Sequence, residues 1–177
     1  MTSPGNRIRS DAVRNRDLLV AAAREVLAEQ GLNAPMSAVA KRAGVGQGTL
    51  YRHFPDRLTL ATAVLEENVR DIERVAARPD ATLAEVLGVV TWQMIRSTAF
   101  VGIIRLNGEV SSQHLADRVR TAVDGLPKQA HGTDDVMLAV AMVSGAVLGP
   151  TPEARETSAR RAWDLLGIEI GPVTPGV

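Results

Sequence analysis

The segment SAVAKRAGVGQGTLYRHFPDR, from Ser37 to Arg57, decides the fold. Its pattern predicts two short helices, one from Pro35 to about Ala43 and one from Gln47 to Phe54, separated by a few residues that include glycines. Gly44 ends the first helix and Pro55 ends the second, because glycine adopts the left-handed conformation of a helix end and proline removes a helical N–H. Two short helices joined by so tight a turn are typical of a helix-turn-helix.

The second helix of this pair is too short to bury much core. Leu50 and Phe54, four residues apart, hold one of its faces against the first helix. Its outward side chains are those of Gln47, Thr49, Tyr51, Arg52 and His53. Amide and guanidinium groups match base edges in the major groove of DNA, and hydroxyl and imidazole groups match phosphate oxygens. The segment therefore predicts a helix that enters a DNA groove.

The wider region from Asp17 to Leu60 resembles the N-terminal DNA-binding domain of the TetR family of bacterial one-component regulators. The residues that support the resemblance are Ala22, Ala23, Gly31, Val39, Ala40 and the run AGVGQGTLYRHFPDR. The resemblance implies an all-α homodimer of about nine helices per subunit. It also implies a second domain for a ligand, whose sequence varies between members of the family.

The resemblance implies roles for single residues of the DNA-binding site. Gln47 and Arg52 are the implied base-reading residues. The implied phosphate contacts are Ser37, Thr49, Tyr51, His53 and Arg57, with Gly48 as a point of close backbone approach and Lys41 as a source of general attraction to phosphate. Structural alternatives remain open: Tyr51 packs its ring against the first predicted helix (Asp17 to Gln30), Arg52 is a solvated charge, or His53 caps a helix or fills a gap.

Two positions depart from the family's pattern. The usual Ser or Thr cap of the first short helix is replaced around Ala34 and Pro35, which puts one backbone-to-phosphate contact in doubt. Arg57 stands where the family usually has lysine, so the charge is kept and the donor geometry changes.

Charge is unevenly distributed along the chain, although 20 basic and 20 acidic residues cancel. Residues 1–55 contain eight basic and four acidic residues, and the remaining 122 residues contain 12 basic and 16 acidic ones. A basic N-terminal part favours an anionic partner for that part alone, with chance clustering on a solvated surface as the alternative.

Several function classes are disfavoured by composition. The chain has no cysteine, which excludes disulfides and thiolate chemistry. The longest uncharged apolar stretch, Val136 to Gly149, is too short to span a membrane, and the Arg-rich N-terminus lacks the apolar segment of a secretory signal. Glu109, His114 and Asp117 form only a loose polar cluster. We therefore expect a cytoplasmic protein that is not an enzyme, with no catalytic residue, metal site or cofactor.

Helical periodicity continues through most of the chain and predicts an all-α protein. The expected organisation is a flexible basic arm at 1–12, a helix-turn-helix domain at 13–55, a connecting helix at 56–79, a ligand-binding and dimerisation domain at 80–170, and a flexible tail at 171–177.

The expected second domain contains two candidate sites. Residues proposed to line an apolar ligand cavity, with His114 orienting a polar head group, are Trp92, Met94, Ile95, Phe100, Ile103, Leu106 and Met137. Residues proposed to pair the last two helices around a twofold axis are Val136, Val140, Val143, Val147, Trp163 and Leu166. Ordinary core packing is the alternative for both sets.

These inferences combine into one mechanism. A homodimer places its two recognition helices about 34–36 Å apart on a partly palindromic double-stranded DNA operator. A small lipophilic effector that favours another spacing releases the DNA. Repression is expected, with activation still open. The alternative is a ligand-independent or nucleoid-type helix-turn-helix protein that binds DNA with little sequence preference.

Overall fold

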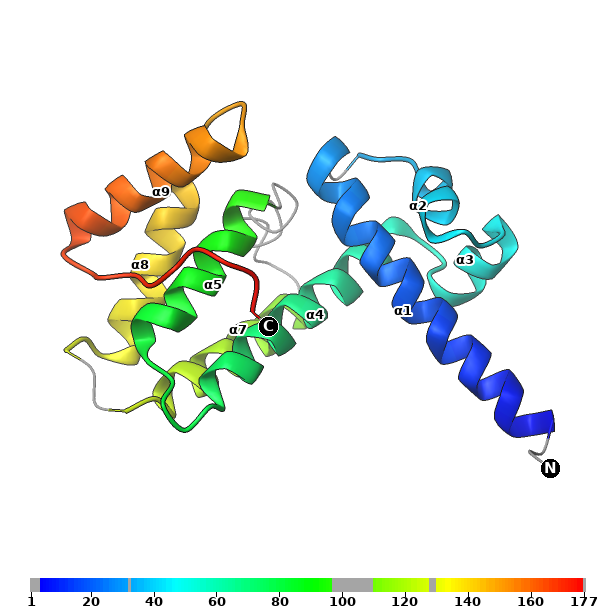
Figure 1. The fold of residues 1–177 in the computed structure, drawn as a ribbon, viewed down its shortest axis with the longest axis horizontal. Coiled ribbons are helices and arrows are strands. Elements are labelled where there is room, and N and C mark those ends of the chain that lie inside the picture. Colours follow the sequence, from blue (N-terminus) through cyan, green and yellow to red (C-terminus); the bar gives the residue numbers. More distant parts are fainter. Residues whose placement is uncertain (1–3, 32, 97–109, 128–129, 177) are drawn as a thin grey trace. The chain divides into compact units, whose positions relative to one another are not determined.

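The computed structural model describes residues 4–31, 33–96, 110–127 and 130–176, and within these ranges every regular element is a helix. The helices in Figure 1 are α1 (Pro4–Gln30), α2 (Met36–Ala43), α3 (Gln47–His53), α4 (Arg57–Ala76), α5 (Leu83–Arg96), α7 (Val110–Asp124), α8 (Thr133–Ala146) and α9 (Pro152–Leu166). The predicted all-α class is confirmed. The apolar run from Phe100 to Leu106 also predicts a helix with a break at Gly102, and this run lies outside the described residues.

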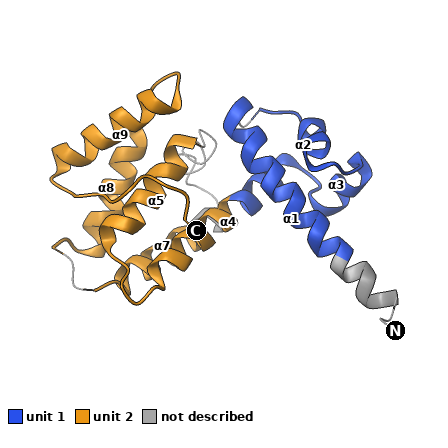
Figure 2. Cartoon of the chain, viewed as in Figure 1, with its two compact units in different colours: residues 1–64 blue, residues 65–177 orange. Residues whose placement is uncertain are grey.

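The chain forms two compact units, residues 1–64 and 65–177, here called unit 1 and unit 2 (Figure 2). The division falls inside α4, so one continuous helix contributes its first turns to unit 1 and the rest to unit 2. The sequence had instead suggested a separate connecting segment at 56–79.

The first helix is longer than predicted. We expected a flexible arm over residues 1–12, but α1 begins at Pro4 and runs to Gln30. Proline is favoured in the first turn of a helix because its fixed φ is already helical and its missing N–H needs no partner there. Extending a formed helix by one residue is far easier than nucleating one, so the stable part of α1 explains how the polar N-terminal residues become helical.

Unit 1 is organised around the buried face of α1, which packs against α2 and α3. The buried apolar side chains of this unit include Leu19, Ala23 and Val26 of α1, Val39 of α2, and Leu50 of α3. Phe54, directly after α3, is also buried, and the guanidinium carbon of Arg16 lies 5.6 Å from its ring centroid. The predicted inward face of the second short helix is therefore confirmed.

Unit 2 is built around α5, whose residues from Val86 to Ile95 are buried except for the partly buried Trp92. A capping box starts this helix: Glu85 Oε2 accepts from the Thr82 backbone N–H at 3.0 Å, and Thr82 Oγ1 accepts from the Glu85 backbone N–H at 3.3 Å. Helix α9 crosses α5, where Trp163 Nε1 donates to Thr91 Oγ1 at 2.9 Å.

The structure places the residues that were proposed for a dimer interface inside unit 2. Most of them belong to the core of unit 2: Val136, Val143, Val147 and Trp163 are buried, and Val140 and Leu166 are partly buried against that core. The large apolar side chains that α8 and α9 leave exposed are Leu138, Met142 and Leu165. Helix α8 is apolar on both faces, so helical spacing alone could not show which face turns inward.

The segment predicted as a flexible tail at 171–177 is also corrected over its described residues. The Gly171 backbone N–H donates to the Ala84 carbonyl oxygen of α5 at 2.7 Å, and Val173 packs against the core of unit 2. Its glycine and proline content suggested disorder, but these residues permit an extended chain to run close to a helix.

Candidate nucleic-acid interface

The turn between α2 and α3 is set by glycine. Gly44 ends α2 with a φ of 68°, in the left-handed region that L side chains rarely adopt. Its N–H and that of Val45 return to the carbonyl oxygens of Lys41 and Ala40 at 3.3 and 3.1 Å, which closes the end of α2. The chain then restarts as α3 within three residues, at Gln47.

Helix α3 separates apolar and polar side chains by face. Leu50 is fully buried, whereas Gln47, Gly48, Tyr51 and Arg52 are exposed. In the described part of the chain, Gln47, Tyr51 and Arg52 have no side-chain hydrogen bond or ion pair. An exposed row of unsatisfied amide, phenol and guanidinium groups on a rigid short helix is able to donate to bases and phosphates.

Thr49 and His53 are partly buried members of the same helix. The His53 ring lies 6.3 Å from the ring of Phe54 in a tilted arrangement. Both side chains therefore lie at the margin between the buried and exposed faces of α3. A polar group in this position is suited to contact the phosphate backbone of a nucleic acid.

Another cation, Arg57, stands at the start of α4, four residues after the end of α3. Asp56 precedes α4 and accepts from Thr59 through the backbone N–H at 2.7 Å and the hydroxyl at 2.9 Å. These hydrogen bonds lower the pKa of the Asp56 carboxyl. Arg57 is partly buried, and its Nη1 lies 3.4 Å from Asn33 Oδ1, a contact that ties it to the loop before α2.

The two basic residues of α2 differ in their surroundings. Lys41 is exposed, with no ion pair among the residues that the structure describes. Arg42 donates to Glu25 at 2.7 Å and to Glu29 at 2.8 and 3.1 Å, so its charge is neutralised by α1. The hydrogen bonds that Arg42 donates to Glu29 and Glu25 raise the pKa of Arg42, and those that Glu29 accepts lower the pKa of Glu29. The sequence suggested general attraction to phosphate for Lys41 and gave no sign that Arg42 is paired with α1.

The N-terminus of α2 has no side-chain cap, because Pro35 stands at the cap position. Ser37 lies exposed in the first turn of the same helix. A hydroxyl beside an uncapped helix N-terminus is chemically suited to a phosphate. The predicted loss of the usual Ser or Thr cap is therefore confirmed.

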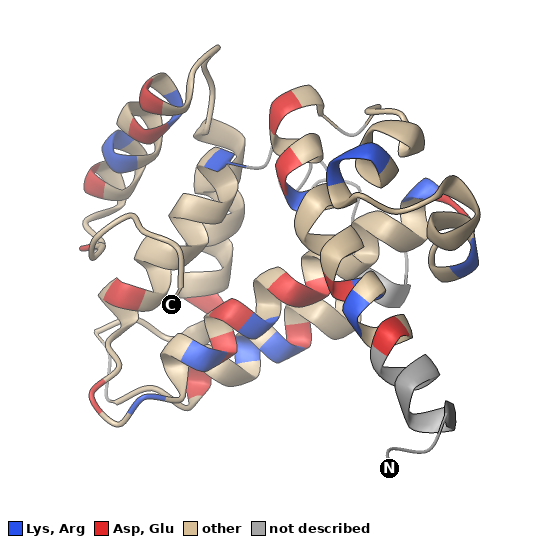
Figure 3. Ribbon diagram, turned by 45° about the vertical axis from the view of Figure 1, so that its right-hand side comes forward, with Lys and Arg blue, Asp and Glu red and all other residues tan. Residues whose placement is uncertain are grey.

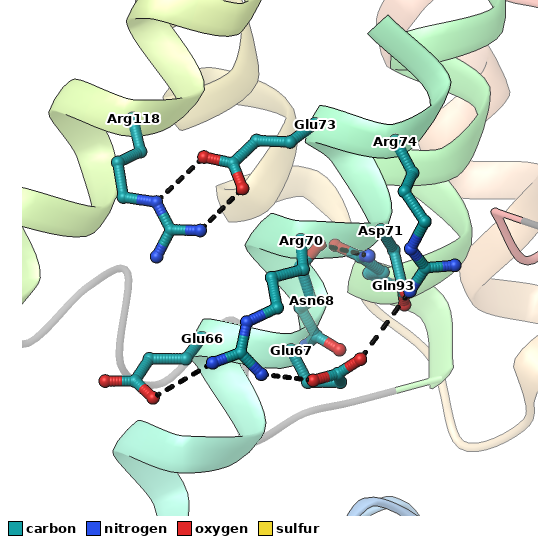
Figure 4. Close-up of polar contacts among 9 residues, drawn as sticks. All are labelled: Glu66, Glu67, Asn68, Arg70, Asp71, Glu73, Arg74, Gln93 and Arg118. Carbon is teal, nitrogen blue, oxygen red and sulfur yellow. Dashed lines mark hydrogen bonds and ion pairs between the residues drawn. The ribbon is translucent and has the colours of Figure 1, made fainter. Parts of the chain in front are cut away.

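Unit 2 contains a second set of polar contacts, along α4. Figure 3 shows acidic and basic residues alternating on this helix, and Figure 4 shows how they pair. Arg70 pairs with Glu67 at 2.6 Å, and Arg118 of α7 donates to both oxygens of Glu73 at 2.8 and 2.6 Å. The hydrogen bonds from Arg118 lower the pKa of Glu73. The Arg118–Glu73 pair links α7 to α4, so these charges are paired within unit 2, unlike the exposed donors of α3.

The proposed ligand-cavity residues are not brought together by the described structure. Met94 and Ile95 are buried in the core of unit 2, and Met137 is partly buried. Trp92 lies partly buried with the Arg96 guanidinium carbon 5.9 Å from its ring centroid. The predicted residues Phe100, Ile103 and Leu106 lie outside the described residues.

His114 lies apart from that apolar set. It is exposed and lines a groove of about 520 Å³ between α4 and α7, together with Glu73, Asp117 and Arg118. In the described ranges, no three His, Asp or Glu side chains gather as metal ligands.

A buried polar contact between α4 and α5 was not predicted from the sequence. Gln93 is 2% exposed and its Nε2 donates to the Asn68 carbonyl oxygen at 3.0 Å (Figure 4). Gln93 Oε1 has no hydrogen-bond partner in the described part of the chain. The signal was present, because Gln93 interrupts an otherwise apolar run in α5. A buried acceptor without a partner is uncommon and points to a ligand or ordered water.

Comparison with known proteins agrees with the helix-turn-helix. Residues 19–64 match the family described as bacterial regulatory proteins, tetR family. The HTH-type transcriptional regulators SAB2452 and SAUSA300_2515 of Staphylococcus aureus are each 38% identical over 63 residues, which is 35% of this chain. The match spans only 34% of the length of these curated relatives.

Two solved structures are similar over nearly the whole chain. The TetR transcriptional regulator SCO0520 from Streptomyces coelicolor is 25% identical with a TM-score of 0.59, covering 88% of this chain and 98% of its own. A TetR transcription regulatory protein from Mycobacterium vanbaalenii is 29% identical with a TM-score of 0.55, covering 92% and 99%. The likeness therefore extends beyond the helix-turn-helix into unit 2.

Proposed function

The chain belongs to the TetR family of bacterial regulatory proteins, and we propose that it is a transcription regulator that binds double-stranded DNA through α3. The observation that supports this function is the exposed row of Gln47, Tyr51 and Arg52 opposite the buried Leu50. Gln47 and Arg52 read base edges, because amide and guanidinium groups form paired hydrogen bonds with adenine and guanine.

The remaining residues of the proposed site position the protein on the DNA backbone. Thr49, Tyr51 and His53 of α3 donate to phosphates. Gly48 permits the DNA backbone to come close to α3, because it has no side chain and nothing in the protein lies within 4 Å of the place where its Cβ would be. Outside α3, Ser37, Lys41 and Arg57 contribute further phosphate contacts. Arg42 is left out of the proposed site, since two glutamates of α1 already bind it.

Competition binding with the full chain tests this function. Duplexes that the protein retains from a randomised pool are sequenced, and the affinity for the selected duplex is compared with random duplex at two salt concentrations. A regulator is expected to prefer its selected duplex by about 10³-fold or more. A nucleoid-type protein would select no sequence, and its affinity would fall steeply with salt on every duplex.

We propose further that the regulator is a homodimer, paired through the exposed face of α8. Leu138 and Met142 are 61% and 55% exposed, lie four residues apart, and have exposed Ala141 between them. Leu165 of α9 is 76% exposed. An apolar stripe of this kind is typical of a surface that another chain covers. A dimer places two copies of α3 on a partly palindromic operator.

The proposed response is release of DNA by a small lipophilic effector bound in unit 2. Gln93 supports this idea, because its buried Oε1 is an acceptor that an effector's N–H or O–H group would satisfy. The expected outcome is repression that the effector relieves, in the cytoplasm where the chromosome lies.

Duplex release tests the proposed response. Anisotropy of a labelled selected duplex is followed while lipophilic compounds are added to the full chain and to the Gln93→Met variant. Gln93→Met is expected to bind the duplex normally and to lose its response to compounds that release the parent protein. A response unchanged in the variant would contradict the role of Gln93.

A further inference from the structure

The segment that follows α9 lies along unit 2 without forming a helix or strand (Figure 1). Gly167 ends α9 with a φ of 67° and turns the chain. Ile168 is 9% exposed in the core of unit 2, and Ile170 and Val173 pack partly buried against that core. These three apolar side chains therefore anchor the segment to the core of unit 2.

Backbone contacts hold the middle of the segment against α5. The Gly171 N–H donates to the Ala84 carbonyl oxygen at 2.7 Å. A Cβ placed on Gly171 would lie 3.1 Å from that oxygen, and a Cβ placed on Gly88 would overlap the Pro172 carbonyl oxygen at less than 3.0 Å. Because the obstructing atoms are backbone, a side-chain rotation cannot relieve either contact. The segment and α5 approach each other as closely as two glycines permit.

The end of the segment reaches α4. A Cβ placed on Gly176 would lie 3.2 Å from the Asp71 carbonyl oxygen and 3.3 Å from Val75 Cγ2. Residues 168–176 thus contact α5 in the middle of the segment and α4 at its end. Helix α4 is the element that continues from unit 1 into unit 2.

We propose that residues 168–176 form a strap that holds the second half of α4 in place, and that release of the strap weakens DNA binding. The first part of this inference is independent of function, and the second part rests on the proposed function. A helix contacted by fewer neighbours opens locally more often, so the strap restricts the motion of α4. Since α4 begins in the unit that contains α3, a looser α4 leaves the recognition helix less well positioned for DNA.

Thermal melting of glycine variants tests whether the strap is docked. Gly→Ala in a helix normally stabilises, because alanine loses less backbone entropy on folding. Gly88→Ala is expected to lower the Tm of the full chain by about 2–4 °C, and to raise the Tm of a shortened chain that ends at Ile170. Gly48→Ala is the matched control for stability, because a Cβ at that helical position meets nothing within 4 Å.

If Gly88→Ala instead raises the Tm of the full chain as much as it raises the Tm of the shortened chain, the docked strap is overturned. If the shortened chain fails to fold, Gly171→Ala in the full chain supplies the comparison. Its Cβ would meet the Ala84 carbonyl oxygen, so a loss of Tm is again expected and an unchanged Tm would overturn the contact.

Hydrogen exchange tests whether the strap holds α4. In Gly88→Ala, amides from Asn68 to Ala76 are expected to exchange about 10-fold faster than in the parent chain, while those of α8 keep their rate. Unchanged exchange in α4 would overturn the bracing role. On the duplex selected by the parent chain, the same variant is expected to bind about 5-fold more weakly.

These readouts separate the strap from the proposed function. Faster exchange in α4 with unchanged DNA affinity would overturn the coupling to DNA and leave the bracing role intact. Failure of the parent chain to select any duplex would overturn the proposed function, while melting and exchange still decide whether the strap holds α4.

Discussion

Arg42 of α2 donates to both carboxylate oxygens of Glu29 of α1, with N–O distances of 3.1 and 2.8 Å. A third hydrogen bond, at 2.7 Å, reaches Glu25 one turn earlier on α1. The paired geometry fixes α2 on α1, and the two glutamates neutralise the positive charge of Arg42 within unit 1. Two adjacent cations of α2 therefore have different roles, because Lys41 has no such partner among the described residues.

This difference predicts distinct salt dependences of DNA binding. Lys41→Gln is expected to reduce the slope of log affinity against log salt by about 1, because one phosphate contact is lost. Arg42→Gln is expected to leave the slope unchanged and to lower the stability of the folded chain only slightly, because exposed ion pairs contribute little. Titration of a labelled duplex at several salt concentrations measures both slopes. Equal reductions in the two variants would contradict the assignment.

The buried contact between α5 and α9 predicts a loss of stability. Thr91 Oγ1 accepts from Trp163 Nε1 at 2.9 Å and donates to the Leu87 carbonyl oxygen at 2.7 Å. Thr91→Val keeps the shape but leaves the indole N–H without its partner, at a cost of about 1–3 kcal/mol. Urea denaturation measures this loss. Trp163→Phe in the Thr91→Val background removes the unpaired N–H. The double variant should therefore lose less stability than the sum of the losses of the two single variants, and a loss equal to that sum would refute the coupling.

The ion pair between Glu73 and Arg118 predicts a pH dependence. Hydrogen bonds from Arg118 hold the pKa of Glu73 below its usual value of 4.5 in the folded chain. The folded state therefore binds the proton less readily than the unfolded state, so the stabilisation is present above pH 4.5 and is lost as the pH falls through the lower, folded-state pKa. The stability difference between parent and Glu73→Gln should be at most about 1 kcal/mol at neutral pH and shrink in acid. Urea denaturation from neutral to acidic pH measures the stability difference between the two chains. A difference that grows as the pH falls would contradict the pairing.

The exposed face of α8 predicts the oligomeric state. Replacing Leu138 and Met142 by glutamate is expected to convert a dimer to a folded monomer, because buried charges without partners oppose association. Leu58→Glu is the matched control, since this leucine is 57% exposed but lies in unit 1. Sedimentation velocity measures the masses. A dimer that survives both glutamates would exclude this face.

Local signals in the sequence were sufficient for the helix-turn-helix. Gly44 and Pro55 mark the ends of α2 and α3, and the spacing of Leu50 and Phe54 identifies the buried face. These features depend on neighbours in the sequence, so the boundaries and the exposed row on α3 followed directly. The pairing of Arg42 with α1 depends on how helices pack and left no local trace.

Periodicity was insufficient in unit 2 because α8 is apolar all round. Val136 and Val143 point into the core, whereas Leu138 and Met142 are exposed, and both pairs have a spacing compatible with one helix face. Only packing against α7 and α9 decides between them. The strap was missed for a related reason: its glycines signal flexibility in an isolated segment, but here they permit contact with the backbone of α5.

The most direct test of the central proposal is the base preference of a single variant. Affinities of the parent chain and Gln47→Ala are measured for the selected duplex and for every single-base change within it. If α3 reads DNA, Gln47→Ala loses about 1–3 kcal/mol of discrimination at one base position and keeps it elsewhere. A variant that weakens binding equally on all the duplexes, or that changes nothing, would contradict recognition through α3.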